Sequence, residues 1–320
     1  MKIVFMGTPE FAIPALQAFL SSSHSVEAVV SAPDKERGRG RQLSFTPVKK
    51  FALENGIKVF TPVLLKSQEF IDEMKKINPD LFVIVAFRIL PMEVFRLPKF
   101  GSINLHGSLL PKYRGAAPIQ WALINGENET GVTTFFLNDK VDTGNIILQE
   151  KIKIDDEDNF GSVHNKLMML GAGVILKTVD LIEKGEVVET TQDNQLSSPA
   201  PKITKEICEI DWNKSAYQIH NLVRGLAPYP AAFFVHNKKI IKVFKTKVVA
   251  VENIPQESGW IDIEISSNKE ISSIKILQTK KEIFISTGEN YLQIFELQPE
   301  GRKKMRTDEF LRGNIFPLSY

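Results

Sequence analysis

The chain has 320 residues, of which 43% are hydrophobic and 24% are charged, and its formal net charge is +2. This length fits two domains, and the composition is ordinary for a globular protein, so the fold needs no metal or disulfide for stability. The single cysteine, Cys208, excludes an internal disulfide and a multi-cysteine metal site, and no apolar run approaches the roughly 20 residues of a transmembrane helix. With no signal or transit segment, these features favour a cytoplasmic location.

The N-terminal residues predict the start of a parallel α/β sheet. Lys2–Met6 is a strand, Glu10–Leu20 a helix after a Gly-Thr-Pro turn, and Val26–Ser31 the next strand. The strand is not followed by G-x-G-x-x-G, which weakens a nicotinamide-dependent enzyme. We therefore expect a Rossmann-like, doubly wound, mostly parallel sheet.

Residues 32–46 form a polar loop in which arginines alternate with glycines. Arg37, Arg39 and Arg41 lack apolar neighbours with which to pack. A solvated surface loop is the simpler interpretation, and a flexible arm that binds phosphates is the sharper one. A helix follows over Thr46–Asn55, with Thr46 as N-cap and Pro47 in its first turn.

Asp80–Ala86 reads as a buried central strand, and Phe87–Leu90 leaves its carboxyl end. In an open α/β sheet, ligands bind at this edge. The next strand, Ser102–Leu105, delivers Asn104 and His106 to the same edge.

The turn at Asp139–Gly144 adds a carboxylate, Asp142, one strand away from His106 in the expected sheet. An imidazole can exchange a proton, an amide can donate to a developing oxyanion, and a carboxylate can orient the imidazole. Asn-x-His alone is a weak signal, and a structural histidine is the simpler interpretation. No histidine pairs with another histidine or with cysteine at metal-ligand spacing, so we expect no metal.

Periodicity is lost between residues 186 and 205, after a long amphipathic helix over Asn159–Lys184. We therefore place one domain at 1–188, a linker at 189–206 and a second domain at 207–320. The second domain is poor in helices, apart from Ser215–Val223, and dense in short alternating strands, which predicts a small barrel or sandwich.

Two basic clusters occur in the second domain, at 237–247 and 302–306. A solvated strand face is one interpretation, and an electrostatic track for a phosphate backbone is the other. The cations of the two clusters include Lys238, Lys239, Lys242, Lys245, Lys247, Arg302, Lys303 and Lys304.

The segments INLHGSLLPKYRG (103–115) and KVDTGNIIL (140–148) resemble the folate-dependent formyltransferase family. Asn104, His106 and Asp142 match the Asn, His and Asp that this family uses for catalysis. The resemblance covers the whole chain and implies an OB-like C-terminal barrel. At 1–16, 32–49, 108–123 and 202–212 the chain resembles members that act on charged initiator tRNA.

The resemblance implies transfer of a formyl group from 10-formyltetrahydrofolate to the α-amine of methionine on initiator methionyl-tRNA, without a metal. It also implies that Arg39 senses the end of the acceptor stem and that the other basic residues named above contact the tRNA. The implied folate contacts are Arg88, Ile89, Leu90, Ser108, Leu109, Leu110 and Pro111. FRILP (87–91) departs from the pattern of tRNA-specific members, which leaves the role of Arg88 open.

Two other functions remain open at this point. A related formyltransferase acting on a small sugar-linked amine would need neither the Gly/Arg loop nor the C-terminal barrel. An RNA-binding module without catalysis would not need Asn104, His106 and Asp142. A monomer is the expected oligomeric state for each of these functions.

Overall fold

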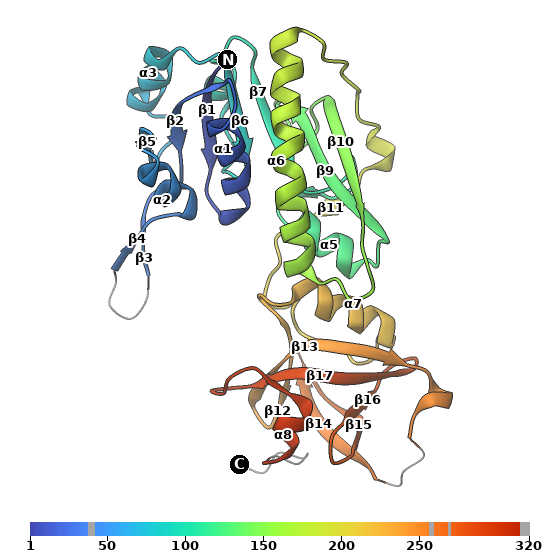
Figure 1. Ribbon diagram of the computed structural model, residues 1–320. Helices are drawn as coiled ribbons and strands as arrows, with labels where there is room; N and C mark the ends of the chain where they lie inside the picture. Colours follow the sequence, from blue (N-terminus) through green and yellow to red (C-terminus); the bar gives the residue numbers. More distant parts are fainter. Residues whose placement is uncertain (38–41, 256–258, 268–269, 314–320) are drawn as a thin grey trace. The chain divides into compact units, whose positions relative to one another are not determined.

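The computed structural model describes residues 1–37, 42–255, 259–267 and 270–313, which divide into two compact units (Figure 1). The first unit comprises residues 1–118, 129–153 and 164–201, and the second comprises 119–128, 154–163 and 202–320. The domain bounds 1–188, 189–206 and 207–320 stay a prediction. Within the described ranges, no helix is both long and apolar enough to cross a membrane.

The first unit is built on a seven-stranded sheet in the order β10-β9-β7-β6-β1-β2-β5. The five strands from β7 to β5 are parallel, and β9 and β10 are antiparallel to their neighbours. This confirms the mostly parallel α/β fold. The strands are β1 (Lys2–Gly7), β2 (Ser25–Val30), β5 (Val59–Phe60), β6 (Leu81–Val85), β7 (Ser102–His106), β9 (Glu129–Phe136) and β10 (Ile146–Lys153).

Both faces of this sheet are covered, as the run of buried residues in β1 and β6 requires. Val4 and Met6 pack into one apolar cluster with residues of α3 and α4, whereas Phe5 contacts Phe19 of α1. The helices are α1 (Ile13–Leu20), α2 (Pro47–Glu54), α3 (Gln68–Ile77), α4 (Met92–Phe95), α5 (Pro118–Ile124) and α6 (Phe160–Lys184). The Thr46 side chain accepts a hydrogen bond from Lys49 N, which confirms the predicted N-cap of α2.

The arginine-rich loop contains more structure than its composition indicates. β3 (Lys35–Arg37) pairs antiparallel with β4 (Gln42–Ser44), so the polar loop expected over 32–46 contains two short paired strands. Arg39 and Arg41 lie outside the described residues, as does the side chain of Arg37.

The second unit is an antiparallel sheet that curls until β13 pairs with both β12 and β17. This confirms the barrel-like β domain. One strand, β13 (Lys239–Val249), is longer than the short strands expected in this domain, and its register to β17 shifts near Lys245. The other elements are α7 (Ala216–Leu226), β12 (Ala232–His236), β14 (Trp260–Ser267), β15 (Glu270–Gln278), β16 (Ile283–Ser286), β17 (Tyr291–Pro299), β18 (Met305–Arg306) and α8 (Thr307–Leu311).

Most of the segment after α6 packs within the first unit. β11 (Pro199–Ala200) pairs in parallel with β8 (Arg114–Gly115), and Ala200 O accepts hydrogen bonds from Ala116 N and Ala117 N. Residues up to 201 therefore belong to the first compact unit, although their sequence has no helix or strand periodicity.

Candidate active site

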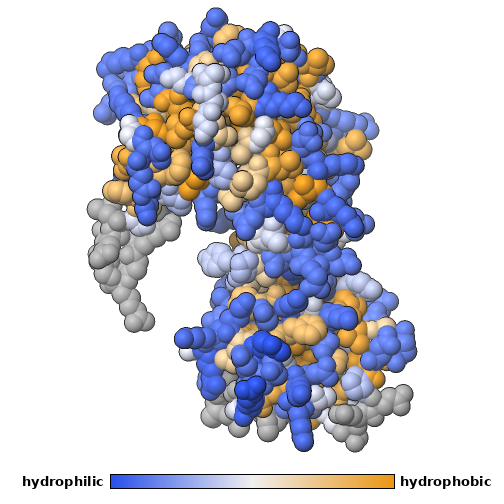
Figure 2. All heavy atoms as spheres, in the orientation of Figure 1, coloured by the Kyte–Doolittle hydropathy of each residue, from blue (hydrophilic) through white to orange (hydrophobic). Residues whose placement is uncertain are grey.

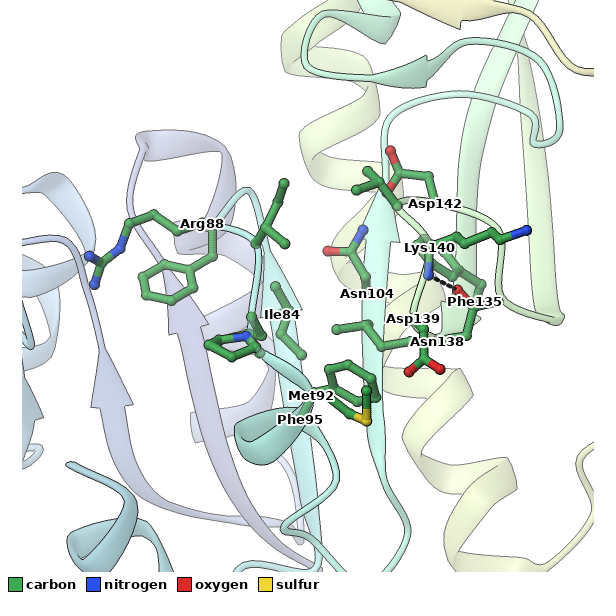
Figure 3. Close-up of a pocket in the computed structure, with 16 residues that line it drawn as sticks. Ile84, Arg88, Met92, Phe95, Asn104, Phe135, Asn138, Asp139, Lys140 and Asp142 are labelled. Atoms are coloured by element: carbon green, nitrogen blue, oxygen red, sulfur yellow. Dashed lines mark hydrogen bonds between the residues drawn. The ribbon is translucent and has the colours of Figure 1, made fainter. Parts of the chain in front are cut away.

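Asn104 and His106 leave the carboxyl-terminal half of β7, a strand that lies between β6 and β9. Asn104 is half-buried and lines a cavity, whereas His106 is buried. Figure 3 shows Asn104 projecting toward the cavity, on the same side as Asp142. The edge predicted from the order of strands and loops therefore carries these polar groups.

His106 contacts both a backbone carbonyl and a carboxylate. Its Nε2 lies 2.8 Å from Tyr113 O, and its Nδ1 lies 3.9 Å from Asp142 Oδ2. A carbonyl oxygen only accepts hydrogen bonds, so Nε2 carries a proton in either charge state of the ring. Nδ1 is therefore the nitrogen that can take up or release a proton, and it faces Asp142.

Asp142 is held in a tight turn between β9 and β10. Its φ of 54° lies in the left-handed region, and its Oδ2 accepts a hydrogen bond of 2.9 Å from Gly115 N. Gly144 is required in this turn because a Cβ there would collide with the carbonyl oxygen of Phe136. The Val-Asp-Thr-Gly motif is thus explained by backbone geometry as well as by its carboxylate.

A cavity of about 330 Å³ opens between the end of β6 and the turn before β10. This volume is at the lower end of the range typical of small-molecule sites. Its apolar residues come from β6 and the chain that follows it, and from β9 and the turn that follows it; Asn104 and Asp142 are among its polar groups. Side chains that line it include Ile84, Phe87, Ile89, Leu90, Met92, Phe95, Phe135, Leu137 and Val141.

Arg88 borders the cavity, but its guanidinium points away from it (Figure 3). Nη1 and Nη2 donate to Val63 O (3.1 Å) and Pro62 O (2.7 Å). Desolvation by burial lowers the pKa of Arg88. Arg88 therefore has a structural role, because its side chain holds the neighbouring 62–63 segment in place.

The Ser-Leu-Leu-Pro turn lies behind the cavity wall. Ser108 Oγ donates to Lys112 O, and Leu110 packs with Phe135 and Ile146. Of the described residues that line the cavity, none comes from Ser108, Leu109, Leu110 or Pro111, whereas Ile89 and Leu90 do line it. Folate contact by the four residues of the turn stays a prediction.

Gln192 is a site residue that the sequence analysis missed. It is 6% exposed, and its amide nitrogen donates to the carbonyl oxygens of Asp142 (3.0 Å) and Gly144 (2.8 Å). Nothing in its polar, aperiodic segment distinguished it from the glutamines that lie in solvent. Bonds to backbone atoms leave no pattern in the sequence.

The two basic clusters of the second unit lie on or next to β13 and β18, both of which pair with β17. β17 pairs with β13 on one side and with β18 on the other. Lys238, Lys245, Lys247, Arg302, Lys303 and Lys304 are exposed, Lys239 and Lys242 are half-buried, and hydrophilic side chains predominate on the face of this unit drawn in Figure 2.

Acidic residues reduce the net charge of this basic surface. Lys245 Nζ lies 2.8 Å from Glu157, and Lys304 Nζ lies 2.8 Å from Glu296. The hydrogen bond from Lys245 lowers the pKa of Glu157. No acidic residue occurs between 235 and 250 in the sequence. The positive field of the folded strand is nevertheless weaker than this sequence indicates, because an acidic residue from another segment, Glu157, pairs with Lys245.

Ligand atoms of His24, Asp180 and Glu183 lie within 4.8 Å of one another, the only such group of metal-ligand residues in the part of the chain that is described. None of the three lines the cavity. His24 Nε2 is instead hydrogen-bonded to Asp180 at 2.9 Å.

This fold and site define a class of protein, the formyl transferases. Residues 1–179 match the formyl transferase family, and residues 202–314 match the formyl transferase C-terminal domain. An N-formyltransferase from Helicobacter canadensis, solved with folinic acid and dTDP-3-aminofucose, has a TM-score of 0.66 at 22% identity, covering 95% of this chain and 100% of that one. HypX from Aquifex aeolicus, solved with tetrahydrofolic acid, has a TM-score of 0.61 at 16% identity, covering 98% of this chain and 48% of that one. At these identities the two structures show the shared fold alone.

Relatives that align with nearly the whole chain show which family of formyl transferases it belongs to. The chain is 44% identical over 315 residues to the methionyl-tRNA formyltransferase of Clostridioides difficile, covering 98% of this chain and 97% of that protein. It is 43% identical over 319 residues to the corresponding protein of Caldanaerobacter subterraneus, covering 99% and 98%. The chain belongs to the methionyl-tRNA formyltransferase family.

Proposed function

We propose that this chain transfers the formyl group of 10-formyltetrahydrofolate to the α-amine of methionine on initiator methionyl-tRNA, in the cytoplasm where translation begins. The observation that carries the proposal is the conjunction of Asn104, His106 and Asp142 at one edge of the sheet, in a chain with 44% full-length identity to a methionyl-tRNA formyltransferase. The apolar cavity beside Asn104 supports the folate part of the proposal, because a pteridine ring needs an apolar wall.

The reaction begins when the neutral α-amine attacks the formyl carbon. The carbonyl oxygen becomes an oxyanion, which the Asn104 amide N–H and a protonated His106 Nδ1 stabilise by hydrogen bonds. His106 keeps its orientation because Nε2–H is bonded to Tyr113 O, and the Asp142 carboxylate compensates the imidazolium charge.

The tetrahedral intermediate collapses when the bond from carbon to folate N10 breaks. The attacking amine loses a proton and N10 gains one, which Asp142 and His106 assist through an ordered water. The products are tetrahydrofolate and formylmethionyl-tRNA, and no covalent enzyme intermediate or metal is required.

The direct test is formyl transfer from radiolabelled 10-formyltetrahydrofolate by the purified protein. We expect label on initiator methionyl-tRNA and much less on elongator methionyl-tRNA. Label on a dTDP-linked amino sugar but on neither tRNA would contradict the proposal and favour the small-amine alternative.

A further inference from the structure

We propose that Gln192, oriented by Arg114, is a positioning residue for formyl transfer that fixes the Asp142 turn and thereby holds the Asp142 carboxylate beside His106. This inference rests on the proposed function, because it presupposes that the pair of His106 and Asp142 acts on the formyl group. It concerns the part of the chain between α6 and the second unit that its sequence marks as a linker.

The Gln192 amide contacts the Asp142 turn at two carbonyl groups, which are two residues apart in the chain. Nε2 has two hydrogens, and the two acceptors within reach are Asp142 O at 3.0 Å and Gly144 O at 2.8 Å. Because Gln192 is 6% exposed, water has little access to replace either bond. The two hydrogen bonds of this side chain thus stabilise the turn, as backbone hydrogen bonds from a neighbouring segment would.

Arg114 determines which way the Gln192 amide faces. Its Nε and Nη2 both donate to Gln192 Oε1, at 3.1 and 2.7 Å, and its Nη1 donates to Asn194 Oδ1 at 2.9 Å. A guanidinium only donates, so the oxygen of the amide faces Arg114 and the nitrogen faces the turn. The amide is therefore locked in the one orientation that binds the two carbonyl groups.

The segment 113–115, which contains β8 and Arg114, also holds both members of the pair. Tyr113 O binds His106 Nε2, and Gly115 N binds Asp142 Oδ2. That segment is in turn fixed by Ser198, whose backbone oxygen accepts from Arg114 N and whose Oγ accepts from Tyr113 N, each at 2.9 Å. The distance from His106 to Asp142 therefore depends on one short segment and its neighbours.

Backbone conformation makes these external bonds necessary. Tyr113 and Asp142 have φ values of 62° and 54°, which are unfavourable for residues other than glycine. Without Gln192, the turn can relax toward a commoner conformation and move the carboxylate away from His106 Nδ1. A displacement of about 1 Å in a catalytic group can cost on the order of 100-fold in rate.

The test compares Gln192→Met with Gln195→Met, an exposed glutamine three residues further along. We expect Q192M to reduce kcat about 10- to 100-fold while KM for methionyl-tRNA stays within twofold, and Q195M to match the wild type. Wild-type kcat in Q192M would overturn the inference. Absence of formyl transfer in the wild type itself would instead refute the proposed function.

A double-mutant cycle separates positioning from general destabilisation. In the Asp142→Asn background, the rate of formyl transfer is measured in single turnovers with enzyme in excess. There Q192M should lower this rate by less than a further twofold, because the carboxylate that Gln192 positions is already absent. A full multiplicative loss in that background would overturn the inference. Should Q192M not fold, Gln192→Glu carries the same test, because it keeps the acceptor for Arg114 but places a carboxylate against the two carbonyl groups.

Discussion

At the scale of single residues, the proton on His106 is placed by a backbone carbonyl rather than by a side chain. Because Tyr113 O engages Nε2, the acid and base chemistry falls to Nδ1, the nitrogen that faces Asp142. The sequence predicted that Asn104, His106 and Asp142 would meet, since each lies where a strand ends. The sequence does not indicate which ring nitrogen of His106 carries the proton, because that depends on the carbonyl group of Tyr113, seven residues further along the chain.

Arg88 shows how a residue in an unusual motif can have a structural task. Its guanidinium binds two carbonyl oxygens of the 62–63 segment and does not enter the cavity. We expect Arg88→Met to lower the free energy of unfolding by about 1–3 kcal/mol, because two charge-assisted hydrogen bonds are lost. Chemical denaturation measures this change.

The same variant should leave KM for the folate within a few-fold of the wild-type value. The exposed Lys99→Met serves as a control for the removal of a cation. A large rise in KM for the folate with unchanged stability would show that Arg88 contacts the donor.

At the scale of elements, the strands of the parallel sheet were predictable because buried strands are continuous apolar runs. The β3–β4 hairpin was not, because its arginines and glycines are typical of loops. The course of residues 190–200 was not predictable either, since Gln192 and Ser198 act through backbone atoms.

The contact between α7 and β13 contains a histidine that links stability to pH. His220 Nδ1 lies 2.9 Å from Thr246 Oγ1, and burial, aided by the charge of Arg224, lowers the pKa of His220 from its usual 6.5. The unfolded chain therefore binds a proton below about pH 6.5 that the folded chain still excludes. Stability consequently falls as pH decreases through this range.

We expect His220→Gln to reduce this dependence on pH. Thermal unfolding between pH 7.5 and 5.5 should show a smaller decrease in Tm for the variant than for the wild type. The limit for one proton is about 1.4 kcal/mol per pH unit. Parallel curves for the two proteins would show that folding does not lower the pKa of His220.

At the scale of the whole molecule, the chemistry of the first unit must be joined to recognition of a large, charged substrate. The basic surface on β13 and around β18 is partly neutralised by Glu157 and Glu296, so we expect exposed cations without such neighbours to contribute most to tRNA binding. We expect Lys303→Ala to raise KM for methionyl-tRNA and to reduce the salt slope by about 1. KM values measured across a series of salt concentrations test this.

A matched control for Lys303→Ala is Lys75→Ala, which removes an exposed lysine from α3. Its KM and salt slope should equal those of the wild type. Equal effects of the two substitutions would indicate a response to net charge rather than contact with the phosphate backbone.

We propose that the Gly/Arg loop contacts the tRNA, because its sequence resembles the corresponding loop of tRNA-specific formyltransferases. We expect Arg39→Ala to raise KM for charged tRNA with little change in KM for the folate. Steady-state kinetics with each substrate varied in turn measures both values. An effect confined to the folate would contradict the assignment of this loop.

In the proposed mechanism, His106 performs formyl transfer as the partner of Asn104 and Asp142. This role is tested most directly by His106→Ala, assayed for formylation of initiator methionyl-tRNA and, in parallel, for binding of the same tRNA. We predict a fall in kcat of about 10²- to 10⁴-fold with tRNA affinity unchanged. Formylation at the wild-type rate by H106A would contradict this mechanism.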